Sequence, residues 1–352
     1  MRRADPSLDH DQLTSTSPYA GTLSAFSTGV KLRTRYHHLL PNREASKPLK
    51  FWASDCTRII DTAKYLMTGL LGYSWPTQAS LQIIPETSDL GGDTLTPGDT
   101  CLAYRSDKKR GHDYGYTQLW KYRDTYLPAI ATRLHKENSA IRFGMEEVYV
   151  MQEMCGFETL ARGSSPWCGV FSHDEWKNFE YARDVLHFYR TGPGNPYSKA
   201  MGSLWADATA KLLAKGGEEA GRMFLSVAHD GDVLPVMNFL GLFDGEELPV
   251  THRKDDRRWR SGQLVPMMGR LIVELMSCSA DGHNEDSVKK FVRIDINDGV
   301  TAIPLCQSGP AGSCPLEDFL RFVETGRKEA GSFSNVCKLD SSGGEEITFL
   351  HQ

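Results

Sequence analysis

The stretch that most constrains the fold is Met223 to Gly241, where an apolar run stops abruptly at two polar residues. Met223 to Ala228 is typical of a buried strand, and His229 and Asp230 follow it directly, before an apolar segment with helical spacing. A buried strand of an α/β sheet delivers the residues after it to the sheet's carboxyl edge, where ligands bind. The pattern predicts an α/β protein with His229 and Asp230 at that edge. A backbone contact by His229 and a helix cap by Asp230 form the purely structural alternative.

The same order of strand, polar loop and helix occurs earlier in the chain. Leu49 to Ala53 (LKFWA) is typical of a strand, and the polar SDCTR after it ends in Arg58, at the start of a helix that Gly72 is suited to end. In one parallel sheet, Arg58 would meet His229 and Asp230 at a common edge. Arginine and histidine suit phosphate oxygens, and a carboxylic acid can protonate a departing alkoxide, so the trio suits a phosphate monoester. The residues alone supply no nucleophile.

The remainder of the chain divides by its periodicity. Glu86 to Thr100 is rich in turn-forming residues and is expected to be irregular. Helical spacing follows, with a capping-box signature at Ser172 and Glu175, and strand-like segments return in the last third, where Asn297 to Gly299 can turn a hairpin. This order predicts an α/β domain of residues 1–84 and 222–352, interrupted by a mainly helical domain of residues 85–221. A chain of 352 residues is long enough for two such domains.

A surface helix is expected near the N-terminus. Ser17 is suited to cap it and Pro18 to occupy its first turn. The residues that follow are spaced as one buried stripe of a helix: Tyr19, Leu23, Phe26 and Val30.

Composition argues against several kinds of partner. A net charge of −5 is unsuited to general nucleic-acid binding, and no apolar run approaches the roughly 20 residues of a membrane span. Two cysteine pairs bracket short loops, Cys155 with Cys168 and Cys306 with Cys314, and no C-x-x-C pair is present. This spacing suits disulfides of an oxidising compartment better than a metal site, and no cofactor is predicted.

Seven segments together resemble the histidine acid phosphatase family, the branch of the histidine phosphatase superfamily that also contains the phytases, and within it the secreted fungal acid phosphatases. They extend over nearly the whole chain: SPYAGTLSAFSTGVKLRTRY, FWASDCTRIIDTAKYLMTGL, CGFE to Cys168, FYRTGPGNPYSKAMGSLW, FLSVAHDGDVL, VPMMGRLIVELMSC and IPLCQSGPAGSCPLEDF. The combination is specific, although no single segment is. The resemblance implies a phosphoglycerate mutase-like α/β sandwich domain with an inserted helical domain, in agreement with the order of elements above.

The resemblance also implies roles for the candidate residues in the hydrolysis of small phosphate monoesters through a phosphohistidine. Arg58 resembles the second phosphate clamp of the family, and His229 and Asp230 resemble its H-D pair, a phosphate donor and a general acid. The family's nucleophile is the histidine of an R-H-G-x-R-x-P motif at the end of the first strand, and no R-H-G occurs here. Because Leu8 to Tyr36 resembles the segment after that motif, we expect the chain to be truncated before it and inactive alone.

Two further functions stay open. One is a catalytically inactive relative that binds phosphate through Arg58 and His229. The other is a phytase, although phytases typically carry Asn after the H-D pair, where this chain has Gly231 and Asp232. The sequence gives no oligomeric state.

The resemblance extends to the eight cysteines. It implies the pairs Cys155–Cys168, Cys306–Cys314 and Cys101–Cys337. Cys56 and Cys278 are left over, either to pair with each other or to remain as thiols. The pairing and the family imply an extracellular or secretory location, although the N-terminal residues lack the apolar core of a signal peptide.

Three other groups of polar residues have weaker functional interpretations. Asp9, His10 and Asp11 could bind a metal, and His37 or His38 could replace the nucleophile, but terminal and adjacent side chains of this kind are usually solvated. A basic cluster could attract multiply phosphorylated substrates, but a mobile solvated loop is the favoured interpretation. Its members are Arg253, Lys254, Arg257, Arg258 and Arg260.

Overall fold

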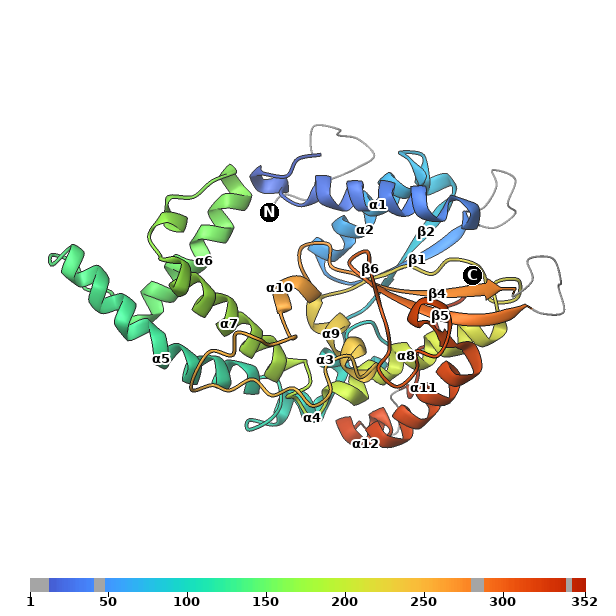
Figure 1. Ribbon diagram of the computed structural model, residues 1–352. Coiled ribbons are helices and arrows are strands. Elements are labelled where there is room, and N and C mark those ends of the chain that lie inside the picture. The colour runs from blue at the N-terminus through green and yellow to red at the C-terminus, as the bar shows by residue number, and fades with distance from the viewer. Residues whose placement is uncertain (1–12, 41–47, 280–287, 340–343) are drawn as a thin grey trace.

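The computed structural model describes residues 13–40, 48–279, 288–339 and 344–352, which form two sheets surrounded by helices (Figure 1). The first sheet is parallel and has the order β2-β1-β3: β2 (Ala79–Ile84), β1 (Leu49–Ser54) and β3 (Ser226–Val227). The second is antiparallel, with β4 (Leu271–Cys278), β5 (Lys289–Ile296) and β6 (Gly299–Thr301) in order and β7 (Cys314–Pro315) also paired with β5. The predicted α/β class is confirmed.

Strand β1 is the centre of the parallel sheet. Phe51, Trp52 and Ala53 are at most 1% exposed, because strands pair with β1 on both sides and α2 (Thr57–Leu71) packs on it. Its neighbour β3 is shorter than the predicted strand from Met223 to Ala228, since only Ser226 and Val227 lie in the ladder. One side of β3 pairs with β1, and no described strand pairs with its other side.

The predicted buried stripe of the N-terminal helix is wrong. A 3₁₀ turn covers Ser17–Tyr19, and α1 (Thr22–Tyr36) begins only after Gly21. Leu23 and Val30 are 38% and 42% exposed. The buried face is made of small residues instead: Ala25, Thr28 and Gly29.

Small residues are needed there because α1 crosses α2 at very short range. A Cβ atom added to Gly29 would lie 2.1 Å from the carbonyl oxygen of Leu66, and one added to Gly69 would lie 2.0 Å from that of Phe26. Each helix therefore uses a glycine where the other's backbone passes. Apolar periodicity does not report such a contact, since the residues that make it have no apolar side chain.

The middle of the chain is helical. Its helices are α3 (Pro97–Thr100), α4 (Leu102–Ser106), α5 (Tyr114–Glu137), α6 (Met145–Arg162), α7 (His173–Arg190) and α8 (Ser198–Lys215). The predicted capping box opens α7, where the Glu175 N–H donates to Ser172 Oγ at 3.3 Å and the Ser172 N–H donates to Glu175 Oε2 at 2.8 Å. Helices α5, α6 and α7 extend away from the sheets, whereas α8 packs against α9 (Asp230–Phe239) and α11 (Leu316–Ala330) (Figure 1).

The last third contains the predicted hairpin. Asn297 and Asp298 have φ angles of 53° and 72°, as a two-residue turn between β5 and β6 requires. The short helices α10 (Ser261–Leu264) and α12 (Phe333–Cys337) complete the fold. None of the described helices is long and apolar enough to cross a membrane.

The basic cluster of residues 253–260 is not a solvated loop, and that interpretation is wrong. The Arg257 side chain is 2% exposed, and its Nε donates to Asp184 Oδ2 at 2.6 Å. Arg253 pairs with Asp255 and Arg260 pairs with Glu180. Most of the cluster's charge is therefore neutralised within the protein, and it does not form a free basic surface.

Three disulfides link the cysteine pairs that the resemblance implied: Cys101–Cys337, Cys155–Cys168 and Cys306–Cys314. Cys56 and Cys278 are both free thiols. Of the two alternatives for this last pair, the structure has the unbridged one.

Candidate active site

The candidate site lies where the three parallel strands end. After β1, the chain turns into α2 and presents Arg58 in its first turn; after β3, His229 and Asp230 open α9. Strand β2 ends at Ile84, which lies opposite Ser54 of β1, and Glu86 follows two residues later. Since parallel strands end at one edge, these side chains converge although the sequence separates them widely.

The ring of His229, which follows β3, contacts one side chain that follows the middle strand β1 and one that follows the other outer strand β2. Its Nδ1 lies 3.2 Å from Arg58 Nη2, and its Nε2 lies 3.0 Å from Glu86 Oε1. A guanidinium can only donate, so Nδ1 is the acceptor, and in the neutral ring Nε2 carries the proton that is donated to Glu86. The structure thus brings Arg58 and His229 together as predicted and adds Glu86.

Asp230 does not cap the following helix, so the structural alternative for this residue is wrong. It is the first residue of α9, and His229 holds the cap position, where its backbone N–H donates to Asp232 Oδ2 at 3.1 Å. The Asp230 side chain is 51% exposed, and its Oδ1 accepts from the N–H of Gly231 at 2.8 Å. It is therefore accessible to a substrate at the amino end of a helix.

A buried histidine lies behind Asp230. His187 Nε2, from α7, is 4.0 Å from Asp230 Oδ2. Burial lowers the pKa of His187 to about 4, and the nearby Asp230 carboxylate opposes this shift. His187 is consequently neutral over most of the mildly acidic range.

Further carboxylates surround the site. Desolvation raises the pKa of Asp232 well above its ordinary value, and the neighbouring Asp99, Asp230 and Glu86 raise it further. Burial, followed by the charge of Glu86, also raises the pKa of Asp99. The site therefore contains more acidic than basic groups among its described side chains. Sequence reasoning missed Glu86, although a polar residue just after a strand was the signal that located Arg58 and His229.

A groove runs from the site between the two sheets. This cavity of about 780 Å³ is lined by β3 on one side and β4 on the other, with α1 and α8, and it reaches Asp232. Within the described ranges, β4 pairs only with β5 and β3 only with β1, so both strands turn an unpaired edge toward the groove.

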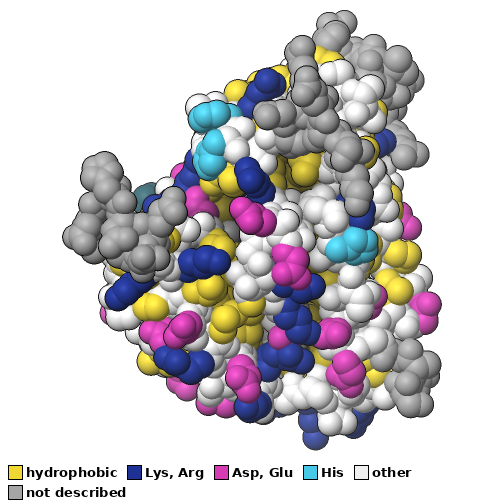
Figure 2. Space-filling model, turned by 90° about the vertical axis from the view of Figure 1, so that its right-hand side faces the viewer, with side chains coloured by type: hydrophobic (Ala, Val, Ile, Leu, Met, Phe, Trp, Pro, Cys, Tyr) yellow, Lys and Arg dark blue, Asp and Glu magenta, His cyan; other side chains and the backbone are white. Residues whose placement is uncertain are grey.

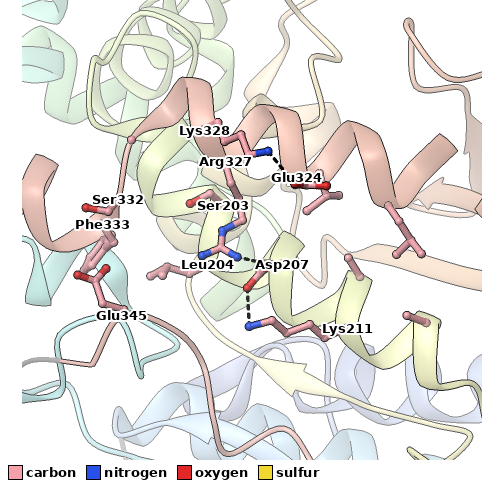
Figure 3. Close-up of a pocket in the computed structure, with 15 residues that line it drawn as sticks. Ser203, Leu204, Asp207, Lys211, Glu324, Arg327, Lys328, Ser332, Phe333 and Glu345 are labelled. Atoms are coloured by element: carbon pink, nitrogen blue, oxygen red, sulfur yellow. Dashed lines mark hydrogen bonds and ion pairs between the residues drawn. The ribbon is translucent and has the colours of Figure 1, made fainter. Parts of the chain in front are cut away.

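A second cavity, of about 410 Å³, lies between α8 and α11, and Figure 3 shows its polar side chains. Arg327 and Lys211 both contact Asp207, at 2.6 Å and 3.0 Å, and Lys328 contacts Glu324 at 2.6 Å. Lys211, Arg327 and Lys328 are each paired with a carboxylate, so the described lining of this cavity offers a phosphate no unpaired cation.

No hydrogen bond or ion pair joins His37 or His38 to Arg58, His229 or Asp230 within the described residues, although His38 lines the groove. His37 and His38 lie in a 3₁₀ turn after α1, exposed, and the only hydrogen bond found for either ring is from His37 Nδ1 to the Thr34 oxygen within the described residues. Asp9, His10 and Asp11 lie outside the described residues. Across the described ranges, no three or more His, Cys, Asp or Glu side chains are grouped so that they could hold a metal ion.

The charged side chains on one face of the molecule are of both signs (Figure 2). On the face in Figure 2, Lys and Arg side chains are interspersed with Asp and Glu, and apolar side chains lie between them. Among the described side chains visible there, Lys and Arg form no extended basic area.

Comparison with known proteins places the chain in a family. The family model described as histidine phosphatase superfamily (branch 2) matches residues 7–297. Phytase PHO112 of Candida albicans is 32% identical over 338 residues, which cover 95% of this chain and 69% of that protein. Acid phosphatase PHO1 of Komagataella pastoris is 31% identical, over 93% of this chain and 68% of that protein.

Solved structures show the same fold. The phytase from D. castellii superimposes with a TM-score of 0.83 at 24% identity, over 98% of this chain and 73% of that one. A multiple inositol polyphosphate phosphatase of Bifidobacterium longum has a TM-score of 0.64 at 11% identity, over 86% and 78%. With a family model across residues 7–297 and relatives above 30% identity along most of its length, this chain belongs to branch 2 of the histidine phosphatase superfamily, beside yeast acid phosphatases and phytases.

Proposed function

We propose that this chain carries the phosphate-binding and proton-donating half of an acid phosphatase that hydrolyses small phosphate monoesters. The observation that carries the proposal is the convergence of Arg58, His229 and Asp230 at one sheet edge, with Arg58 Nη2 3.2 Å from His229 Nδ1. The similarity to acid phosphatases and phytases supports the same reaction class.

Each residue has one role in this proposal. Arg58 donates to the phosphate oxygens from the first turn of α2, where the helix amides add favourable dipoles. His229 donates through Nε2–H. Asp230, exposed and adjacent, protonates the oxygen of the leaving alcohol, a role that favours acidic pH because the carboxylic acid must hold its proton.

The nucleophile is proposed to come from a strand that occupies the groove between β3 and β4. The family resemblance assigns it to the histidine of R-H-G-x-R-x-P at a strand end. The edges of β3 and β4 that no described strand pairs, together with a cavity of about 780 Å³ that reaches Asp232, suit an added strand, which would satisfy backbone groups on both sides. The 352-residue chain alone is then expected to be inactive.

Complementation tests this proposal. The chain is assayed on an aryl phosphate at acidic pH, alone and with a peptide that joins an apolar strand to R-H-G-x-R-x-P. We expect turnover only with the peptide, and its loss when the peptide histidine is alanine or when the chain carries Asp230→Ala, because a covalent route fails by orders of magnitude without a catalytic member. Turnover by the chain alone that Asp230→Ala abolishes would show that the nucleophile lies within these 352 residues.

Two alternatives predict other results. An inactive phosphate-binding relative would bind inorganic phosphate, lose that affinity in Arg58→Ala, and stay without turnover when the peptide is bound. A phytase would prefer inositol hexakisphosphate to the aryl phosphate. Gly231 and Asp232 after His229 and Asp230 favour the general phosphatase. Three disulfides support an oxidising, extracellular or secretory location.

A further inference from the structure

Glu86 makes a direct contact with the candidate phosphate site that none of the proposed roles uses. Its Oε1 lies 3.0 Å from His229 Nε2, and its side chain is 27% exposed. It comes from the loop after β2, and the middle strand β1 separates β2 from the strand that leads to His229. A residue from one outer strand thus reaches the histidine of the other.

We propose that Glu86 is a resident competitor for phosphate: its carboxylate occupies the acceptor position at His229 Nε2–H that a phosphate oxygen must take over. This inference rests on the proposed function, because it assumes that His229 donates to the substrate. It goes beyond that function by assigning to Glu86 control of the site's affinity for anions.

The hydrogen-bond roles carry the first step. Arg58 Nη2 lies against Nδ1 and can only donate, so that nitrogen has no proton to offer in the neutral ring. Nε2–H is then the one ring donor left for a ligand, and Glu86 already accepts from it. A phosphate oxygen can use this donor only if Glu86 gives it up.

The charges nearby carry the second step. Charged groups from several elements lie around Glu86 and His229: Arg58 from α2 contacts the ring of His229, while Asp99 from α3 and Asp232 from α9 interact electrostatically with Glu86. Two of these three groups are carboxylates. Asp99 and Asp232 cannot neutralise Glu86, and Arg58 is shared with the ring of His229, so an arriving phosphate meets the Glu86 carboxylate at hydrogen-bond range, where two like charges repel.

The test is the affinity for inorganic phosphate, measured by calorimetry on the 352-residue chain. Glu86→Gln keeps the shape and the acceptor oxygen but removes the charge, and Glu86→Ala removes both. We expect each to bind phosphate roughly tenfold more tightly than the wild type at low salt, because the repulsion is lost. The gain should shrink at high salt, which screens charge but would not alter a purely structural effect.

The matched control is Asp89→Asn, which makes the same change in net charge. Asp89 is exposed and lies three residues from Glu86, and no hydrogen bond joins it to His229 within the described residues. We expect its affinity for phosphate to stay within about twofold of the wild type, since an exposed charge acts through solvent.

The outcomes separate the two proposals. If phosphate binds in an Arg58-dependent manner but Glu86→Gln binds no more tightly than the wild type, the competitor role is wrong and the proposed function stands. An equal gain in Asp89→Asn also refutes it, since net charge alone would explain the effect. If no variant binds phosphate, both proposals fail. Binding by Glu86→Gln and Glu86→Ala where the wild type binds weakly supports both.

Discussion

The buried pair of Arg257 and Asp184 gives the sharpest test of the fold. Asp184 is fully buried and accepts from Arg257 Nε at 2.6 Å and from the N–H and Oγ of Ser261 at 2.6 Å and 2.8 Å. Arg257 also donates to the carbonyl of Lys254 at 3.0 Å and lies 4.9 Å from the ring centre of Tyr181. Arg257→Ala removes all the arginine contacts and leaves the carboxylate without its cation.

The expected cost follows from the contacts that remain. Removal of one partner of a buried ion pair typically costs about 3–5 kcal/mol. Ser261 still donates twice to Asp184, and burial already raises the pKa of this carboxyl, so it can take up a proton in the variant. We therefore expect the lower end, about 3 kcal/mol.

Urea unfolding, followed by circular dichroism, measures this cost. With a slope of about 3 kcal/mol per molar urea, the midpoint of Arg257→Ala should fall by about 1 M. Arg258→Ala is the matched control, because the Arg258 side chain is exposed and the contact with Glu246 is made by the backbone N–H, which the substitution keeps. We expect that midpoint to stay within about 0.2 M of the wild type, as for most surface changes. Equal midpoints for the two variants would show that the ion pair of Arg257 and Asp184 does not stabilise the fold. The interpretation of residues 253–260 as a solvated loop would then stand.

Three further perturbations have expected outcomes. Replacement of Cys101 and Cys337 by Ser removes the disulfide that links residues 236 positions apart. The free energy of unfolding, measured in urea against the oxidised wild type, should fall by about 4–5 kcal/mol. Gly69→Ala places a Cβ 2.0 Å from the Phe26 oxygen and should cost at least about 1–3 kcal/mol, whereas Gly156→Ala, whose Cβ meets nothing within 4 Å, should be neutral or slightly stabilising in the same assay. The pKa of His187 is about 4 in the folded protein, below its ordinary 6.5. As the pH falls, the unfolded chain therefore binds this proton before the folded protein does. The free energy of unfolding should drop between about pH 6.5 and 4 by up to about 3 kcal/mol. His187→Gln should flatten this slope while the exposed His38→Gln keeps it, and a slope unchanged in His187→Gln would contradict the assignment.

The parts of the site that the sequence predicts are those that local pattern determines. Arg58 and His229 each follow a run typical of a buried strand, and the carboxyl edge of a parallel sheet collects such residues whatever the exact strand order. Glu86 also follows a strand, β2, but it begins a stretch of turn-forming residues that predicts an irregular connection. Its contact with His229 depends on the order β2-β1-β3, which no local pattern specifies.

The errors in the fold have a similar origin. The stripe through Leu23 and Val30 follows apolar spacing, but helix α1 is held by a backbone approach at Gly29 that has no hydrophobic signature. The charge run predicts a solvated Arg257, because such runs usually lie in solvent, but the ion pair with the distant Asp184 makes its burial tolerable. In both cases the residue that determines the burial, Leu66 for Gly29 and Asp184 for Arg257, is distant in the sequence. Local sequence patterns do not identify such a partner.

The charge balance of the described site residues, the nucleophile that the proposed reaction requires and the groove all bear on the strand proposed above. Four acidic side chains, of Glu86, Asp99, Asp230 and Asp232, lie around His229, and burial raises the pKa of Asp99 and Asp232 toward the neutral acid. Among the described residues Arg58 is the cation that contacts the ring of His229. A phosphate dianion bound there needs further positive charge. A strand ending in R-H-G-x-R, placed between β3 and β4, would bring two arginines and a histidine to this edge and pair both open strand edges. One segment would thus supply the chemistry, the charge and the hydrogen bonds, and its arginines would give Glu86 a partner when phosphate takes its place on His229.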